Sequence, residues 1–208
     1  MTTEPDDVRR RARFSASEIA RADAIIRMAW RSLPGAHRQL LEAIGASQWQ
    51  VVNEPLGSAV DGFLRSGGHR ALSRSDRISL DDALAVWISQ LRIMVVDAGH
   101  AVLESLDESA YEEFVSNTAW HEWGHALSLE RCSPEDVAAG HRLLELAPKG
   151  VREVIRGGGY RSKEYTHELV ANVYALLMAR RQRNVLEQPQ WLNEEIYSLM
   201  MRVTGWSE

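Results

Sequence analysis

The stretch AWHEWGHALSLE, residues Ala119 to Glu130, contains the pattern HExxH within what reads as one continuous helix. Residues four apart on an α-helix differ by about 40° around the axis and lie one turn apart, so His121 and His125 face the same side. Their ring nitrogens can therefore reach one metal ion, of which Zn2+ is the typical example. Glu122 lies about 100° around the helix from His121. This position suits a general base that faces a water molecule beside the ion.

The HExxH pattern arises by chance in only about 2% of chains with this length and composition. Gly124 lies inside it, despite a cost of about 1 kcal/mol relative to alanine within a helix. We interpret this glycine as a point where another backbone or a substrate comes close. Trp120 and Trp123 are expected to pack the helix rather than to contact substrate. The pattern therefore indicates a metal site rather than two histidines that share a helix face by coincidence.

A catalytic zinc usually has three protein ligands, so a third must come from elsewhere in the chain. The short metzincin continuation is absent, because Ser128 and Arg131 stand where that pattern has glycine and histidine. The segment KEYTHELVANVYALLMARR, residues 163–181, has helical spacing and carries Glu168 on one side with small residues. We therefore predict Glu168 as the third ligand.

Other residues near this segment have predicted supporting or competing roles. Ala171 and Ala175 would let the segment pack closely against the HExxH helix. Asn172 could accept a hydrogen bond from the far nitrogen of a ligand histidine and fix its tautomer. Three residues remain as rival third ligands: His167, which points about 100° away from Glu168, His141 and Glu164. The other histidines are expected in structural or surface roles: His37, His69 and His100.

The remaining sequence mixes helices with short strands. A capping-box pattern at Ser15 and Glu18 predicts the start of a first helix, and Ser133 before Pro134 is typical of an N-cap. The further expected helices are 34–45, 107–129, 133–146, 163–183 and 191–203. The expected strands are 48–52 and 91–97, and the glycine-, serine- and arginine-rich residues 53–80 read as loops or a hairpin. Strands in the first half and helices in the second half predict an α+β fold.

Composition limits the class of protein. The chain has 208 residues, of which 45% are hydrophobic and 25% are charged. This length and composition suit one domain over 1–208. We expect it to comprise a helical segment at 1–46 and a catalytic core at 47–208. A net charge of -5 argues against nucleic acid as the main partner. No apolar run approaches the roughly 18 residues that a membrane helix needs. With no signal-peptide pattern and a single cysteine, Cys132, we expect a cytoplasmic protein, with secretion by a route that needs no cleaved signal as the alternative.

HEWGH (121–125) and ELVANVYA (168–175) together resemble the motifs of gluzincin-type zinc metallopeptidases. The second motif is similar to that of the ImmA/IrrE family of intracellular bacterial metallopeptidases and of lethal-factor-type toxin peptidases. The resemblance covers roughly residues 90–180. It implies a zincin-like fold, in which a small twisted sheet with an antiparallel edge strand borders the cleft and the C-terminal half is mostly helical.

The resemblance also implies roles for individual residues. Zn2+ would be bound by His121, His125 and Glu168, and Glu122 would be the general base. Lethal-factor-type enzymes use a tyrosine upstream of the glutamate ligand to stabilise the oxyanion. Tyr160 is assigned that role here, with Tyr165 as the alternative.

Two functions are expected from these features. The first is a zinc-dependent endopeptidase whose protein or peptide substrate lies extended against the strand at 92–97, which is expected at the edge of the sheet. The second is a regulatory protein that keeps the zincin scaffold but acts by recognising a partner without proteolysis. The arginine-rich residues 65–77 and the helical N-terminal segment motivate the second function, because hydrolysis needs neither.

Overall fold

The computed structural model describes residues 16–73, 80–129, 133–157, 165–183 and 191–204. The chain divides into two compact units, one of Met1–Arg31 with Ser47–Thr118 and the other of Ser32–Ala46 with Ala119–Glu208. Helix α6 (Glu108–Leu129) contributes its first half to one unit and its second half to the other. The expectation of a single domain, with a helical segment at 1–46 and a catalytic core at 47–208, stays a prediction.

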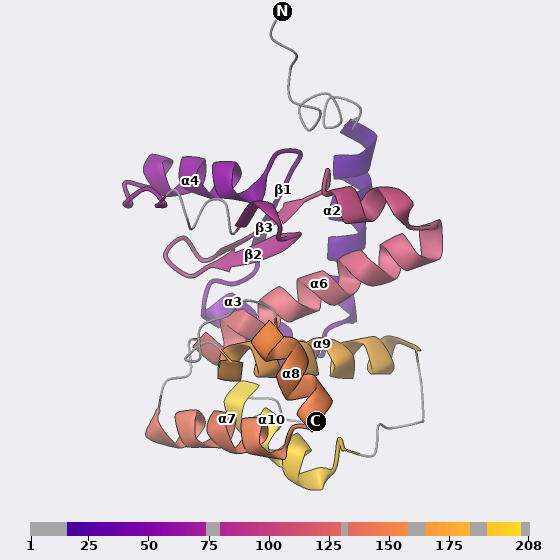
Figure 1. The fold of residues 1–208 in the computed structure, drawn as a ribbon. Helices are drawn as coiled ribbons and strands as arrows, with labels where there is room; N and C mark the ends of the chain where they lie inside the picture. Colours follow the sequence, from indigo (N-terminus) through magenta and orange to yellow (C-terminus); the bar gives the residue numbers. More distant parts are fainter. Residues whose placement is uncertain (1–15, 74–79, 130–132, 158–164, 184–190, 205–208) are drawn as a thin grey trace, which may run out of the picture. The chain divides into compact units, whose positions relative to one another are not determined.

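The first unit is built around a three-stranded sheet. Its strands are β1 (Gln48–Val52), β2 (Ala85–Ile88) and β3 (Ile93–Asp97), in the order β1-β3-β2 (Figure 1). β1 runs parallel to β3, with Gln48 opposite Ile93, and β2 runs antiparallel to β3, with Ala85 opposite Val96. The predicted strands at 48–52 and 91–97 are therefore confirmed, and β2 is an additional strand.

The central position of β3 corrects one expectation. Residues 92–97 were expected to form the edge strand against which a substrate lies, but β3 is hydrogen-bonded to a neighbour on each side. A peptide adds to a sheet through unpaired backbone groups, and β3 has none to offer along its paired length. The antiparallel strand that lies at the edge of this sheet is β2.

Helix α4 (Leu56–Ser66) covers one face of the sheet and corrects a second expectation, since residues 53–80 were read as loops or a hairpin. Its apolar residues Leu56, Val60 and Leu64 recur at helical spacing and pack with Val52, Ile88 and Val95 of the strands. Burial of this stripe outweighs the low helix propensity of the glycines within α4. The remaining elements of the unit are α2 (Ala16–Ser32), the 3-10 helix η1 (Ala101–Ser105) and the start of α6.

The second unit is helical within the described residues. It holds α3 (Gly35–Ala43), the second half of α6, α7 (Pro134–Leu146), α8 (Lys149–Gly157), α9 (Tyr165–Arg183) and α10 (Glu194–Thr204). α7 packs against both α9 and α10. The Ser133 hydroxyl accepts a hydrogen bond from the Asp136 backbone N–H at 3.1 Å, so the predicted N-cap of α7 is confirmed.

The expected helices at 34–45, 107–129, 133–146, 163–183 and 191–203 are confirmed to within a few residues, and α8 is an additional helix. The α+β class is also confirmed, whereas the zincin-like fold stays a prediction. Several residues with predicted roles lie outside the described residues: Ser15, Cys132, Tyr160 and Glu164. None of the described helices has the length and hydropathy needed to cross a bilayer.

Candidate metal centre

Helices α6 and α9 approach each other closely in the second unit. Contacts join Gly124 to Ala171 and Ser128 to His167, so residue numbers rise along one helix as they fall along the other, and the two helices are antiparallel. A Cβ atom added at Gly124 would lie 2.8 Å from Ala171 Cα and 3.2 Å from Tyr174 Cβ. Such short contacts leave no room for a larger residue. The predicted close approach at Gly124 is therefore confirmed, with another backbone as the neighbour.

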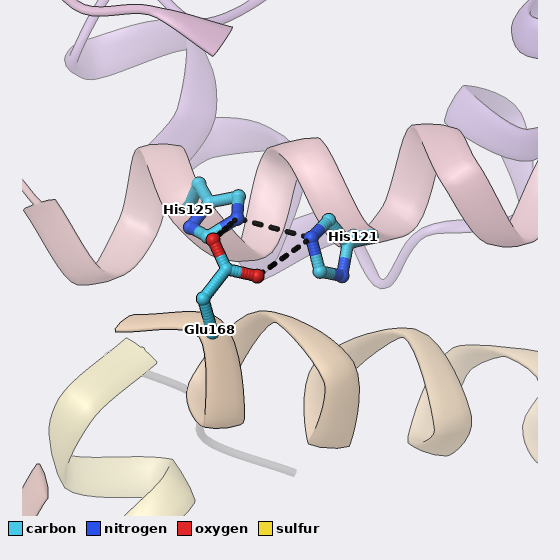
Figure 2. A group of neighbouring side chains, drawn as sticks. All are labelled: His121, His125 and Glu168. Carbon is cyan, nitrogen blue, oxygen red and sulfur yellow. Dashed lines mark hydrogen bonds and ion pairs between the residues drawn. The ribbon is translucent and has the colours of Figure 1, made fainter. Parts of the chain in front are cut away.

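This close approach brings the three predicted ligands together (Figure 2). His121 Nε2 and His125 Nε2 lie 3.0 Å apart on α6. From α9, Glu168 Oε1 lies 3.2 Å from His125 Nε2, and Glu168 Oε2 lies 3.6 Å from His121 Nε2. One ligand atom from each residue lies within 4.8 Å of the others, so the group is close enough to bind a metal ion.

The measured separations fit a common coordination geometry. Two ligand atoms that each lie about 2.0–2.1 Å from one tetrahedral ion are about 3.3–3.4 Å apart. The separations of 3.0 Å between the two histidine nitrogens and 3.2 Å between His125 Nε2 and Glu168 Oε1 lie near that value, and the 3.6 Å separation from His121 Nε2 is to the other carboxylate oxygen, Oε2. Glu168 Oε2 is also buried and makes no hydrogen bond within the described residues, because its contact with His121 Nε2 is as long as 3.6 Å. A buried carboxylate oxygen in that state is costly, and a metal ion would satisfy it.

The charges of the ligand group support one another. Burial alone would raise the pKa of Glu168, which is only 7% exposed, but its interactions with His121 and His125 outweigh burial and hold the pKa at about 2. Burial opposes the charged form of His125, yet its hydrogen bond to Glu168 and the charges of Glu122 and Glu168 raise its pKa. Glu168 is therefore ionised at neutral pH and ready to bind a cation.

Glu122, the predicted base, lies beside the ligands on α6. Its side chain is buried, with 6% of the residue exposed. Its negative charge is one of the causes that raise the pKa of His125, so it lies within electrostatic reach of the ligand group. Trp120 and Trp123 are buried in the same helix at 1% and 0% exposure, as expected for residues that pack it.

Two of the rival ligands, His167 and His141, are not part of the metal-binding group, and the third, Glu164, lies outside the described residues. His167 Nδ1 lies 3.3 Å from the Ser128 hydroxyl, and His141 is exposed on α7. His37 is buried with Nδ1 3.1 Å from the Tyr174 hydroxyl, His100 accepts a hydrogen bond from the Val102 backbone N–H at the start of η1, and His69 is exposed. These positions agree with the expected structural and surface roles.

Asn172 corrects a prediction. It was expected to bond the far nitrogen of a ligand histidine, but its side-chain amide donates to the Glu168 backbone carbonyl at 2.7 Å. In a helix, the backbone carbonyl one turn earlier lies within hydrogen-bond distance of a short amide side chain. That local hydrogen bond competes with bonds to more distant residues. Asn172 therefore tightens the turn of α9 that carries Glu168.

The pair formed by Ser128 and His167 was not predicted. The Ser128 hydroxyl donates to the His125 carbonyl at 3.2 Å and lies 3.3 Å from His167 Nδ1. Because this hydroxyl has one proton, it can accept a hydrogen bond from the His167 ring. The pair ties the residue before Glu168 to the backbone of His125. The only sequence signal was that both residues lie near the motifs.

The tyrosine expected at the oxyanion is untested. Tyr160 lies outside the described residues. The alternative, Tyr165, is the first residue of α9 and is partly buried, one helical turn before Glu168.

The described site is thus a group of two histidines and one glutamate that can hold a metal ion, with a second glutamate beside it. Comparison of the chain with protein-family models, curated proteins and solved structures finds no match.

Proposed function

We propose that this chain is a zinc-dependent metallopeptidase that hydrolyses a protein or peptide substrate. The observation that supports it most strongly is the convergence of His121, His125 and Glu168, with Glu122 buried beside them. Two imidazoles and one carboxylate are a typical ligand set of catalytic zinc, and three protein ligands leave a fourth position open. The resemblance of HEWGH and ELVANVYA to gluzincin motifs favours peptide hydrolysis among the reactions that such a site can catalyse.

The residues of the chain would divide the work. His121, His125 and Glu168 would hold Zn2+, which when bound lowers the pKa of water to about 7 and polarises a carbonyl group. Glu122 would accept the proton of the attacking water and pass it to the amine as the C–N bond breaks. Water is then added across the peptide bond, with one carboxylate product and one amine product.

The test compares two glutamate substitutions on one helix. Glu122→Gln removes the base while the ligands stay, so zinc content should be unchanged and cleavage of a mixed peptide library should fall about 100-fold or more. Glu112→Gln makes the same chemical change at an exposed position of α6 and should cleave like wild type. Zinc is measured by elemental analysis and cleavage by mass spectrometry.

The outcomes separate the proposal from its alternative. Full activity in Glu122→Gln would show that Glu122 is not the base. A zinc-loaded wild type that cleaves no peptide, but binds a partner equally well with and without Glu122, would favour the regulatory protein that acts by recognition.

A further inference from the structure

A cavity of about 200 Å³ lies in the same unit as the metal centre. Its walls come from the end of α6 and from α7, α9 and α10. Three valines supply apolar surface, one each from α7, α9 and α10: Val137, Val170 and Val203. The ligand group itself is not part of the lining, so this cavity is a separate feature.

The cavity adjoins the metal ligands along both helices. Ser128, in its wall, donates its hydroxyl proton to the His125 carbonyl and lies three residues, about 4.5 Å, beyond that ligand along α6. His167, in the same wall, directly precedes Glu168. An extended peptide advances about 3.3 Å per residue, so in a peptide that runs along α6 a residue one or two positions from the bond held at the metal would come level with Ser128.

Three polar residues of the wall, Ser128, Asp136 and His167, are engaged with protein atoms, and two others, His141 and Thr166, also line it. Ser128 and His167 lie within hydrogen-bond distance of each other, and Ser128 also donates to a backbone carbonyl. Asp136 Oδ2 accepts the Ser133 hydroxyl at 2.8 Å. The three valines supply the apolar surface of this wall, and apolar surface attracts the apolar groups of a ligand.

The size and opening of the cavity limit its occupant. Pockets for whole small molecules usually have about 300–1,000 Å³, whereas a cavity of about 150 Å³ accommodates benzene. Val137 is 48% exposed, while Val170 and Val203 are buried at 0% and 4%. The cavity thus has an apolar surface that solvent can reach and an apolar buried wall, with room for one side chain.

We infer that this cavity binds an aliphatic side chain, of the size of leucine, in the peptide substrate, one or two residues from the bond that is hydrolysed. This inference rests on the proposed function, because it assigns part of the substrate to a place beside the proposed catalytic site. It predicts that the sequence preference of the enzyme is set by the three valines.

The first experiment changes the accessible valine. Val137→Phe narrows the cavity at a position where a larger side chain can extend into solvent, so folding and zinc content should be unchanged. Two peptides are compared that differ at one position, the one where wild type prefers an aliphatic residue. One peptide has leucine there and the other has glycine. The kcat/KM for the leucine peptide should fall at least about 10-fold relative to the glycine peptide. Met201→Phe, at a residue of α10 that is 38% exposed and outside the lining, is the matched control and should keep the wild-type ratio.

The second experiment needs no catalysis. N-acetyl-leucinamide at millimolar concentration should shift the methyl NMR signals of Val170 and Val203 in wild type, and N-acetyl-glycinamide should not. Val137→Phe should weaken these shifts, whereas Met201→Phe should retain them. The inference is overturned if N-acetyl-leucinamide does not shift the valine signals of wild type. It is also overturned if a folded, active Val137→Phe protein keeps the wild-type ratio of kcat/KM for the leucine peptide to kcat/KM for the glycine peptide. If leucinamide binds but no peptide is cleaved, the proposed function fails while the cavity stands as a site for an aliphatic side chain.

Discussion

His125 Nε2 lies 3.2 Å from Glu168 Oε1, although the chain passes through two further helices, α7 and α8, between these residues. The carboxylate is brought to the histidines by the packing of α9 on α6, which Gly124 and Ala171 make possible. The helix interface and the metal centre are therefore one structural feature. A change in either should be measurable in the other.

Replacement of Glu168 by alanine should lower the affinity for Zn2+ by at least about 100-fold, because loss of even a residue that supports a ligand costs about 10–100-fold. Glu153→Ala, at an exposed glutamate of α8, removes the same side chain away from the site and should bind zinc like wild type. Competition with a coloured chelator measures both affinities. Undiminished zinc binding in Glu168→Ala would exclude this residue as the third ligand. If wild type binds no zinc, the three residues are not a zinc site.

Gly124→Ala should destabilise the helical unit and weaken zinc binding together. The new methyl group would press on the Ala171 backbone at 2.8 Å, and such overpacking costs about 1–3 kcal/mol, partly offset by the better helix propensity of alanine. The same substitution at Gly62 of α4, where an added Cβ has no neighbour within 4 Å, should leave the free energy of unfolding equal or higher. Urea unfolding measures both. A Gly124→Ala protein as stable and as tightly zinc-bound as wild type would contradict the close-packing account.

The parts of this structure that the sequence predicted are those set by local spacing. The positions of His121 and His125 follow from helix geometry alone, and the helical spacing of Glu168 with small residues indicated it correctly as their neighbour. The long helices were also predictable, because their apolar residues recur over several turns.

The errors came from tertiary structure and from competing local bonds. Nothing in the apolar run of β3 distinguishes a central strand from an edge strand, because that depends on where the short β2 pairs. The glycines of α4 suggested a loop, and only packing against the sheet makes this segment helical. Asn172 bonds its own helix, which spacing relative to the ligands does not reveal.

The oxyanion assignment predicts a difference between two tyrosines. Tyr160→Phe should lower kcat by about 100-fold or more with little change in KM, because the lost hydroxyl would act mainly in the transition state. Tyr165→Phe makes the same change on the first turn of α9 and should retain most of the activity. Steady-state kinetics on one peptide substrate decides between them. The reverse result would assign the role to Tyr165, and two active variants would exclude both tyrosines.

Buried His37 predicts a loss of stability in mild acid. The residue is fully buried, and burial, assisted by the positive charge of Arg181, lowers its pKa from 6.5 to about 4. Between these pH values the unfolded chain binds a proton that the folded chain excludes, so protonation favours unfolding. The contribution of His37 is constant above pH 6.5 and declines as the pH falls toward 4, by about 3 kcal/mol in total.

Urea unfolding of the zinc-free protein from pH 7.5 to pH 4.5 would measure this effect through a substitution. His37→Gln removes the titrating group, so its free energy of unfolding should decline less steeply below pH 6.5 than that of wild type, whatever its stability at neutral pH. His69→Gln makes the same exchange at an exposed histidine and controls for the loss of an imidazole elsewhere. The difference in slope is decisive because His125 and Glu168 titrate in all three proteins and their contributions cancel. Parallel curves for wild type and His37→Gln would mean that His37 is protonated as readily in the folded chain as in the unfolded one, which its burial against Tyr174 opposes.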